Sequence, residues 1–273
     1  MRYWKLLSLL LPLAACSPNL PKKKLTQAKL GSKIFVSDDS LRLDLVNPLH
    51  CPIYIHPKAD DAAVNAALQR DFPLLMPPLA DTLHRRYFTR KSLKELSLQT
   101  DIFFGDPTAA PTPRGFQLPF PTGRRYRIMQ GYEGGFSHNK TASRYALDFQ
   151  LSVGDTVCAA ADGFVVGVIE GYRHGGNDRR WRDYANFITL YHPRFEAFTQ
   201  YVHLVKNGSF VAVGDEVHTG QPIGLSGATG FVSGAHLHFN VFAAPGGLQT
   251  SLPIDSIGNY PAASLRKGSF VEH

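Results

Sequence analysis

Short apolar runs separated by glycine-containing turns fill the second half of this 273-residue chain and constrain its fold more than any other feature. From residue 123 to residue 243 these β-branched and aromatic runs alternate with Gly-Asp and Gly-Gln pairs, and no amphipathic helix of note is evident. Such spacing is typical of antiparallel strands joined by turns, with long loops at one end. The expected strands are residues 146–151, 156–160, 163–170, 186–192, 199–204, 216–218, 222–226 and 236–243. The sequence therefore predicts an all-β, mainly antiparallel domain over residues 123–243.

A second, smaller β-rich domain is expected over residues 35–106. Residues 40–47 (SLRLDLVN) alternate apolar and polar side chains, as a half-buried strand does. Residues 51–56 and 96–104 resemble further strands, whereas residues 60–68 (DDAAVNAAL) form either a short helix or a long turn. Because this region contains no catalytic motif, we expect an accessory domain, with a small sandwich as the favoured architecture.

Three further segments flank the two domains. Residues 107–122 contain five prolines. Because proline fixes φ and lacks an N–H donor, we expect an extended linker, or a strap against the next domain. Residues 16–34 are polar and basic, as expected for a tether, and residues 244–273 are expected to form a C-terminal tail.

The first 16 residues, MRYWKLLSLLLPLAAC, read as an export signal. A basic start precedes an apolar run that is shorter than the roughly 20 residues needed to span a bilayer. The segment Leu13-Ala14-Ala15-Cys16 resembles a bacterial lipobox, which implies a signal peptide over residues 1–15 and lipidation of Cys16. By resemblance to the sorting rules of bacterial lipoproteins, the following Ser17 implies an outer-membrane anchor facing the periplasm. The alternative is an ordinary signal peptide that is cleaved nearby, with Cys16 incidental.

The strongest local signal for chemistry is His236-Leu237-His238-Phe239. In a strand, residues i and i+2 point to the same face, so the two imidazoles should project together while Leu237 and Phe239 enter the core. Two imidazoles on one face can be zinc ligands, or one ligand beside a catalytic base.

The segments around these histidines match a known pattern. In chain order they are Ala146-Leu147-Asp148-Phe149, Val153-Gly154-Asp155-Thr156-Val157, Ala160-Ala161-Asp162-Gly163, Tyr201-Val202-His203-Leu204, Gly214-Asp215-Glu216-Val217, Gly220-Gln221-Pro222-Ile223-Gly224, Ser226-Gly227-Ala228-Thr229-Gly230 and Gly234-Ala235-His236-Leu237-His238-Phe239. Their order, over about residues 130–243, closely resembles that of the lysostaphin-type (LytM-domain) zinc metallopeptidases, which cut peptidoglycan peptides. The resemblance implies the β-sheet or open-barrel fold of those catalytic domains.

The resemblance also implies the roles of five residues. His138, Asp148 and His238 would bind one zinc ion, and His203 and His236 would be the catalytic pair beside it. Three protein ligands leave one zinc position open for water, whose pKa the ion lowers to about 7. The chain departs from the family at one point, because nine residues separate His138 from Asp148 where the family often has three. The inserted loop must therefore fold out and return His138 to the metal.

Two functions are consistent with this pattern. The first is a zinc-dependent endopeptidase that hydrolyses amide bonds in peptidoglycan peptides. The second is a non-catalytic module that binds or regulates other cell-wall hydrolases. Degenerate members of the family lack ligands or catalytic histidines, whereas all five positions are filled here, which favours the enzyme.

The net charge of +7 raises the question of nucleic-acid binding. Residues 123–273 carry 13 Lys or Arg against 12 Asp or Glu, so most of the basic excess lies nearer the N-terminus. Because a nucleic-acid motif is lacking and the chain is expected to be exported, we predict no nucleic-acid partner. Cys51 and Cys158 could pair in an oxidising compartment, but the apolar run around Cys158 favours a buried free thiol.

Overall fold

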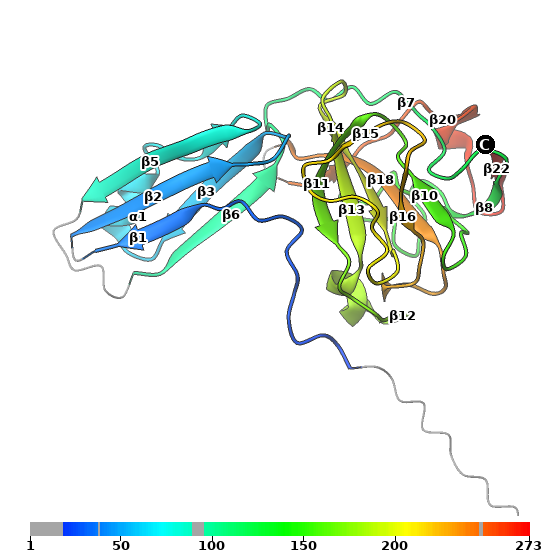
Figure 1. Ribbon diagram of the computed structural model, residues 1–273, viewed down its shortest axis with the longest axis horizontal. Coiled ribbons are helices and arrows are strands. Elements are labelled where there is room, and N and C mark those ends of the chain that lie inside the picture. Colours follow the sequence, from blue (N-terminus) through cyan, green and yellow to red (C-terminus); the bar gives the residue numbers. More distant parts are fainter. Residues whose placement is uncertain (1–18, 38, 89–95, 246–247) are drawn as a thin grey trace, which may run out of the picture.

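The computed structural model describes residues 19–37, 39–88, 96–245 and 248–273, and these form two domains side by side (Figure 1). Most of the strand pairs are antiparallel, which confirms the predicted all-β class. Among the described helices, none is long and apolar enough to cross a membrane. The predicted signal peptide and Cys16 lie outside the described residues.

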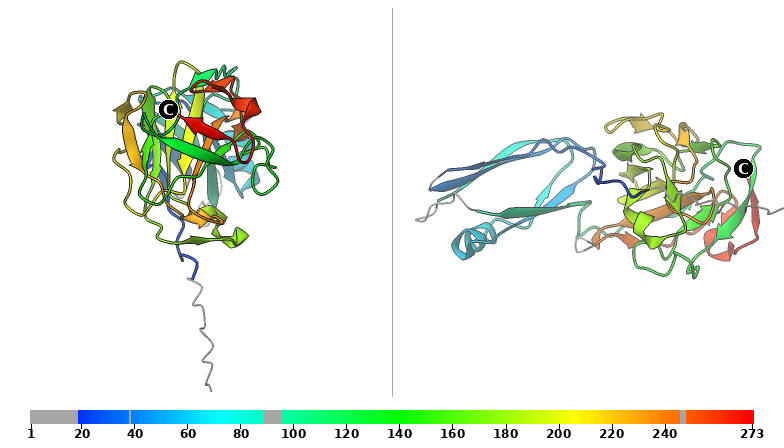
Figure 2. Two further views of the ribbon diagram at one scale, coloured as in Figure 1. Left: turned by 90° about the vertical axis from the view of Figure 1, so that its right-hand side faces the viewer. Right: turned by 90° about the horizontal axis from the view of Figure 1, so that it is seen from below.

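The N-terminal domain consists of two three-stranded sheets that face each other (Figure 2, right). One sheet has the strand order β1-β2-β5 and the other β4-β3-β6. The elements are β1 (Lys33–Val36), β2 (Ser40–Asn47), β3 (Ile53–Ala59), α1 (Ala62–Leu68), β4 (Leu74–Met76), β5 (Ala80–Phe88) and β6 (Leu98–Phe104). Alternate residues of β2 and β3 are buried between the sheets, as the period of two in the sequence predicts.

Residues 60–68 form a short helix rather than a long turn. The Asp61 carboxylate accepts hydrogen bonds from the backbone N–H groups of Ala63 and Val64, both at 2.9 Å. These bonds satisfy donors that are otherwise unpaired at a helix start. Val64 and Leu68 lie on the face of α1 that is buried in the domain core, so packing holds the helix in place.

The C-terminal domain is built on a nine-stranded sheet. The strand order is β15-β11-β13-β14-β18-β9-β8-β22, with β19 paired to β18 off this path. The bounds of these strands are β8 (Arg125–Gln130), β9 (Leu147–Phe149), β11 (Gly163–Ile169), β13 (Phe187–His192), β14 (Ala197–Val202), β15 (Glu216–Val217), β18 (Leu237–Ala243), β19 (Thr250–Ser251) and β22 (Phe270–Glu272).

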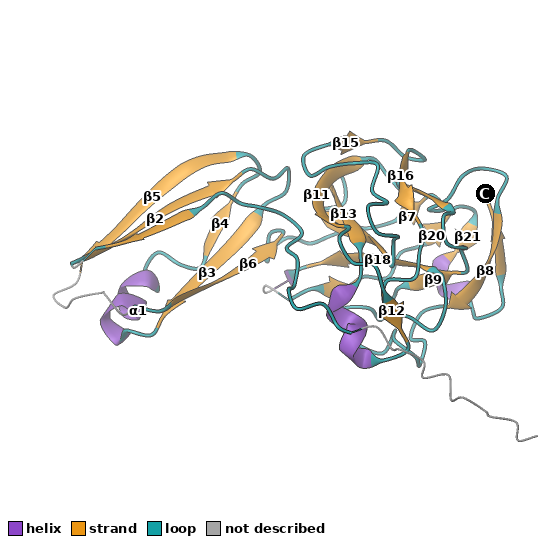
Figure 3. Cartoon of the chain, turned by 60° about the horizontal axis from the view of Figure 1, so that its bottom comes forward, coloured by secondary structure: helices purple, strands orange, loops and turns teal. Residues whose placement is uncertain are grey.

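Shorter elements complete this domain (Figure 3). They are β7 (Gly115–Phe116), β10 (Thr156–Cys158), β12 (Gly175–Gly176), the 3₁₀ helix η1 (Arg179–Tyr184), β16 (Pro222–Leu225), β17 (Gly230–Phe231), β20 (Ser256–Ile257), β21 (Tyr260–Pro261) and the 3₁₀ helix η3 (Ala262–Ser264). Strands β10 and β16 pair with each other, as do β12 and β17, and β7, β20 and β21 form a small sheet. Each of the eight expected strands overlaps one that the structure contains.

Two flanking segments are integral to the C-terminal domain: residues 107–122 follow the strap alternative, and residues 244–273 are not the expected tail. In residues 107–122, Phe116, Leu118 and Phe120 are buried in the domain core, so this stretch is a strap rather than a free linker. In residues 244–273, expected to be a tail, β22 pairs with β8 and Val271 is buried. Both stretches carry apolar residues that are spaced too irregularly to form long strands.

The expected tether is also partly docked. The backbone N–H of Leu25 donates to the Tyr172 hydroxyl at 2.7 Å, and the N–H of Val168 donates to the Gln27 carbonyl at 2.8 Å. The segment therefore follows the C-terminal domain before it enters β1, which begins at Lys33. Figure 1 shows this blue segment passing beside the second domain.

The N-terminal domain covers part of one face of the large sheet. Phe198 and Phe242 lie in one apolar cluster with the N-terminal core, and the His50 ring stacks on Phe164 at 4.3 Å. Because side chains alternate along a strand, Phe242 and His238 lie on the same face of β18, about 13 Å apart. The accessory domain thus occupies one end of this face and leaves the end at His238 open.

Candidate metal centre

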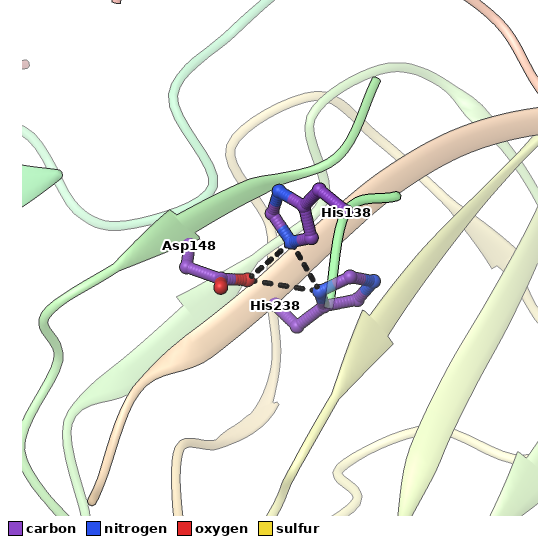
Figure 4. A group of neighbouring side chains, drawn as sticks. All are labelled: His138, Asp148 and His238. Atoms are coloured by element: carbon purple, nitrogen blue, oxygen red, sulfur yellow. Dashed lines mark hydrogen bonds and ion pairs between the residues drawn. The ribbon is translucent and has the colours of Figure 1, made fainter. Parts of the chain in front are cut away.

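The structure brings His138, Asp148 and His238 together (Figure 4). One ligand atom from each residue lies within 4.8 Å of the others. His138 Nε2 is 3.2 Å from Asp148 Oδ1 and 3.2 Å from His238 Nδ1, and that nitrogen is 2.8 Å from Asp148 Oδ1. These three side chains, one from a loop and two from strands, could hold a metal ion.

Strand pairing places two of these residues. Asp148 on β9 lies directly opposite His238 on β18, so both project from the same face of the sheet. Their neighbours Leu237 and Phe149 are fully buried on the other face. The alternation of ligand and core residues along β9 and β18 therefore sets the spacing of the site.

His138 reaches the site from the loop after β8. Its side chain is fully buried, and its Nδ1 lies 2.8 Å from the Gly131 carbonyl oxygen. Since a carbonyl can only accept, Nδ1 donates the proton, and the Nε2 lone pair is directed at the ligand cluster.

The nine-residue segment between His138 and Asp148 returns to β9 because it is hydrogen-bonded to the sheet. Asn240 on β18 donates to the Ala142 carbonyl at 2.8 Å, and the Ser251 N–H donates to the Thr141 carbonyl at 2.9 Å. The Ser251 hydroxyl also accepts from the Tyr145 N–H at 3.0 Å. The loop is thus tied to β18 and β19 and leaves His138 at the site.

Both carboxylate oxygens of Asp148 contact neighbouring side chains. Its Oδ1 faces the two histidines, and its Oδ2 accepts a hydrogen bond from Gln130 Nε2 at 3.2 Å. Burial alone raises the pKa of this carboxyl, but its interactions with the imidazoles of His138 and His238 outweigh burial, so the pKa lies well below its usual range. The carboxylate is therefore ionised and suited to a cation.

Gln130 faces the site because of a β-bulge. The pairing of β8 with β9 shifts between Ile128, opposite Phe149, and Gln130, opposite Asp148. The extra residue, Met129, moves Gln130 from the core face to the ligand face, as bulges commonly do beside functional sites. Sequence reasoning did not identify Gln130, because no residue pattern announces this bulge.

His203 and His236 lie beside the three ligands, with ring centres 4.6 Å apart. His203 Nδ1 donates to the Thr229 carbonyl at 2.7 Å, and His236 Nδ1 donates to the Gly234 carbonyl at 2.9 Å. Both Nε2 atoms are left with lone pairs, and that of His236 is 3.9 Å from Asp148 Oδ1.

Neighbouring backbone and side-chain contacts hold His203 in its conformation. It follows β14 with a φ of 74°, in the left-handed region that non-glycine residues seldom adopt. The Thr229 hydroxyl donates to the Leu204 carbonyl at 2.8 Å and accepts from the Asn186 N–H at 3.0 Å. A side chain at Gly227 would collide with the backbone of Val205 and the His203 carbonyl. Burial, followed by the charges of His236 and His238, holds the pKa of His203 well below its usual range.

Two further polar residues on the strands around the site, Tyr201 and His192, are structural. Tyr201 could have oriented a substrate, but it is fully buried, and its hydroxyl accepts from the Ala160 N–H at 2.8 Å. His192 is also buried, bonded to the Asp162 carbonyl at 2.7 Å and to the Thr199 hydroxyl at 2.8 Å. Cys51 and Cys158 are buried and unpaired.

An open groove of about 870 Å³ exposes the site. The groove is lined by Asp148, His203, His236 and His238. His138 is fully buried within the loop after β8, which forms one wall of the groove. Phe136 on that loop stacks on Phe231 of β17, with ring centres 5.0 Å apart. The groove is large enough for a segment of extended peptide.

Comparison with known proteins identifies a family that part of this chain matches. Residues 142–249 match the model of peptidase family M23. The peptidoglycan DD-endopeptidase ShyA of Vibrio cholerae is 30% identical over 147 residues, which cover 53% of this chain and 31% of ShyA. The glycyl-glycine endopeptidase ALE-1 of Staphylococcus capitis is 36% identical over 119 residues, 41% of this chain and 29% of ALE-1.

Among solved structures, the catalytic domain of lysostaphin from Staphylococcus simulans is 27% identical, covers 44% of this chain and 79% of that domain, and has a TM-score of 0.31. The matched part of this chain spans about a third of the length of the two curated relatives named above. The family match includes Asp148, His203, His236 and His238 and begins just after His138. The part of the C-terminal domain over residues 142–249 is therefore a peptidase family M23 domain by this match.

Proposed function

We propose that this protein is a zinc-dependent metalloendopeptidase that hydrolyses amide bonds in peptidoglycan peptides. The observation that carries the proposal is the cluster of His138, Asp148 and His238 with two further histidines, whose Nε2 atoms are free, in one open groove. The relatives named as peptidoglycan and glycyl-glycine endopeptidases support the substrate class.

The three ligand residues suit zinc. Two imidazole nitrogens and one carboxylate oxygen are a donor set typical of hydrolytic zinc sites. The ligands are also held from behind, as metal ligands commonly are, by the Gly131 carbonyl at His138 and by Gln130 at Asp148. When bound, a zinc ion polarises the scissile carbonyl and lowers the pKa of a coordinated water to about 7.

The chain's own residues supply the proton transfers. His203 and His236 present lone pairs on Nε2 beside the cluster, so either imidazole can accept a proton from an attacking water. Once protonated, the same ring can donate to the leaving amine or stabilise the oxyanion. The carbonyls of Thr229 and Gly234 keep both rings in the required tautomer.

The test is digestion of purified sacculi by the full chain with zinc, with and without a chelator, followed by mass spectrometry of the released muropeptides. We expect peptide-bond cleavage that the chelator abolishes and that the variant His236→Ala lacks. Release of no new fragments by the zinc-loaded, folded protein would overturn the proposal and leave the non-catalytic binding module as the function.

We also propose that Cys16 is lipidated and anchors the protein in the outer membrane, facing the periplasm. Support comes from the lipobox-like Leu13-Ala14-Ala15-Cys16. Membrane fractionation of the full chain and of Cys16→Ser, with mass spectrometry of the mature N-terminus, tests this. Recovery of the unchanged protein in the soluble fraction would overturn it.

A further inference from the structure

One end of the groove carries a cluster of positive charge. Arg127 on β8 and Arg266 and Lys267 in the turn before β22 all line the groove. Among the described residues, Asp148 is the only acidic side chain that lines it, and that carboxylate is committed to His138 and His238. No described carboxylate forms an ion pair with any of the three cations.

This cluster does not follow from the overall charge of the domain. Residues 123–273 carry 13 Lys or Arg and 12 Asp or Glu, so the domain is nearly neutral. Of the described acidic groups only Asp148 lines the groove, whereas five cations line it: Arg127, Lys140, Arg182, Arg266 and Lys267. The separation of charge within a neutral domain favours an anionic ligand in the groove.

The sheet register places Arg127 relative to the metal ligands. The Gln150 N–H donates to the Arg127 carbonyl at 2.9 Å, so Gln150, the residue directly after β9, is the neighbour of Arg127 on β8. Gln150 lies two residues beyond Asp148 on the same face. With strands about 4.8 Å apart and a rise of about 3.4 Å per residue, the Cα atoms of Arg127 and Asp148 are about 8 Å apart. That distance corresponds to about two residues of extended peptide.

The other two cations are fixed by the turn that carries them. The Gly268 N–H donates to the Ile128 carbonyl at 2.9 Å, and the Ile128 N–H donates to the Ser269 carbonyl at 2.8 Å. The Arg266 guanidinium donates to the carbonyls of Ala263 and Leu265. Segments about 140 residues apart in sequence are thus joined at one end of the groove.

The opposite end of the groove is different. There, Val202, Ala185 and Phe231 present apolar surface beside a single arginine, Arg182, and Lys140 lines the groove from the loop after β8. A substrate with one acidic group would therefore bind in one orientation.

We propose that Arg127, Arg266 and Lys267 form a carboxylate-binding subsite. It holds a free carboxylate of the substrate peptide about two residues from the bond to be cleaved and so orients the peptide in the groove. The proposal rests on the peptidase function proposed above for the same groove.

The first experiment compares native sacculi with sacculi whose carboxylates have been converted to amides. The double variant Arg127→Gln/Lys267→Gln removes two charges and leaves Arg266, whose guanidinium also supports the turn. Arg194→Gln, in the β13–β14 turn at the far end of the sheet, is the matched control. At limiting substrate, we expect the double variant to digest native sacculi about fivefold more slowly, the factor of an exposed ion pair, with the control unchanged.

On amidated sacculi, wild type and double variant should be equally fast. Equal rates of the two proteins on native sacculi, or the same slowing on both substrates, would overturn the subsite. If wild type digests neither substrate, the peptidase proposal fails, and the subsite is then decided by binding alone.

The binding experiment uses full-length His236→Ala protein and three fluorescently labelled tetrapeptides measured by anisotropy. The first contains glutamate and a C-terminal amide, the second glutamine and the amide, and the third glutamine and a free C-terminal carboxylate. Tighter binding of the first peptide identifies a side-chain carboxylate, and of the third a terminal one. In either case, introducing Arg127→Gln and Lys267→Gln into the His236→Ala protein should abolish the preference. Equal binding of all three peptides would overturn the proposal.

Discussion

Gln130 links the loop that carries His138 to the carboxylate of Asp148, so its removal should weaken metal binding without removing a ligand. Its Nε2 donates to Asp148 Oδ2 at 3.2 Å and to the Ser137 hydroxyl at 2.8 Å, while its Oε1 accepts from the Phe136 N–H at 3.0 Å. The Oε1 atom also accepts a longer hydrogen bond from the Ser137 N–H at 3.4 Å. Gln130→Leu keeps a side chain of similar size and removes all four hydrogen bonds.

The expected magnitude follows from the partners that are lost. Loss of an outer partner of a metal ligand commonly lowers metal affinity by about 10- to 100-fold, or about 1.4–2.7 kcal/mol. Each neutral hydrogen bond to the loop contributes about 1 kcal/mol to the free energy of unfolding. We therefore expect the Kd for zinc to rise 10- to 100-fold, with a loss of roughly 1–3 kcal/mol in the stability of the metal-free protein.

Competition with a chromophoric zinc chelator measures the Kd, and urea unfolding of the metal-free protein measures the stability. Gln150→Leu is the matched control, because Gln150 is exposed on the same strand face and its one described bond in this region is made by its backbone. An unchanged zinc Kd in Gln130→Leu would refute the reasoning. An equal weakening in Gln150→Leu would show that the effect is not specific to the Asp148 contact.

Three further predictions concern the histidines and the thiols. His238→Ala should lose stoichiometric zinc, whereas His236→Ala should keep zinc and lose turnover; metal analysis showing the same loss in both would contradict the division of roles. Burial lowers the pKa of His192 from 6.5 to about 4. Between pH 4 and 6.5, the His192 imidazole therefore binds a proton in the unfolded chain but not in the folded one. The free energy of unfolding should fall by up to about 3 kcal/mol as the pH drops from 6.5 to 4. Urea unfolding should show a flatter profile in His192→Gln, and parallel profiles would be inconsistent with this. Burial also raises the pKa of the Cys51 thiol, and it raises the pKa of the Cys158 thiol to about 11. A thiol reagent should therefore react with both cysteines only after unfolding. Rapid reaction of the folded protein would contradict this prediction.

The parts of the site that lie on paired strands were predictable from sequence. In β18, His238 alternates with the core residues Leu237 and Phe239, and that period of two determines which side chains share a face. Asp148 lies in an equally regular apolar strand, opposite His238. The proximity of Asp148 and His238 follows from the pairing of these two strands; the family resemblance implied it, whereas the apolar runs and glycine turns indicated only that the strands exist.

The parts that depend on irregular backbone were not predictable. Gln130 faces the site only because a bulge adds one residue to β8. The support of His203 by Thr229 and Asn186 joins residues from three loops or strand ends, with no local pattern that connects them. The C-terminal residues 244–273 pack into the core through scattered apolar side chains, and neither a period of two nor a period of 3.6 marks them as structural.

The unusual spacing of His138 and Asp148 shows how a departure from a family pattern can leave a site intact. A loop lengthened from three residues to nine would normally leave its ends free to diverge, because loop closure costs entropy that no local contact offsets. Here Asn240 lies two residues after His238 on the same strand face and binds the middle of the loop at Ala142. The strand that supplies one ligand therefore also fastens the loop that carries another, so the spacing along the chain can change while the distance between ligand atoms is kept.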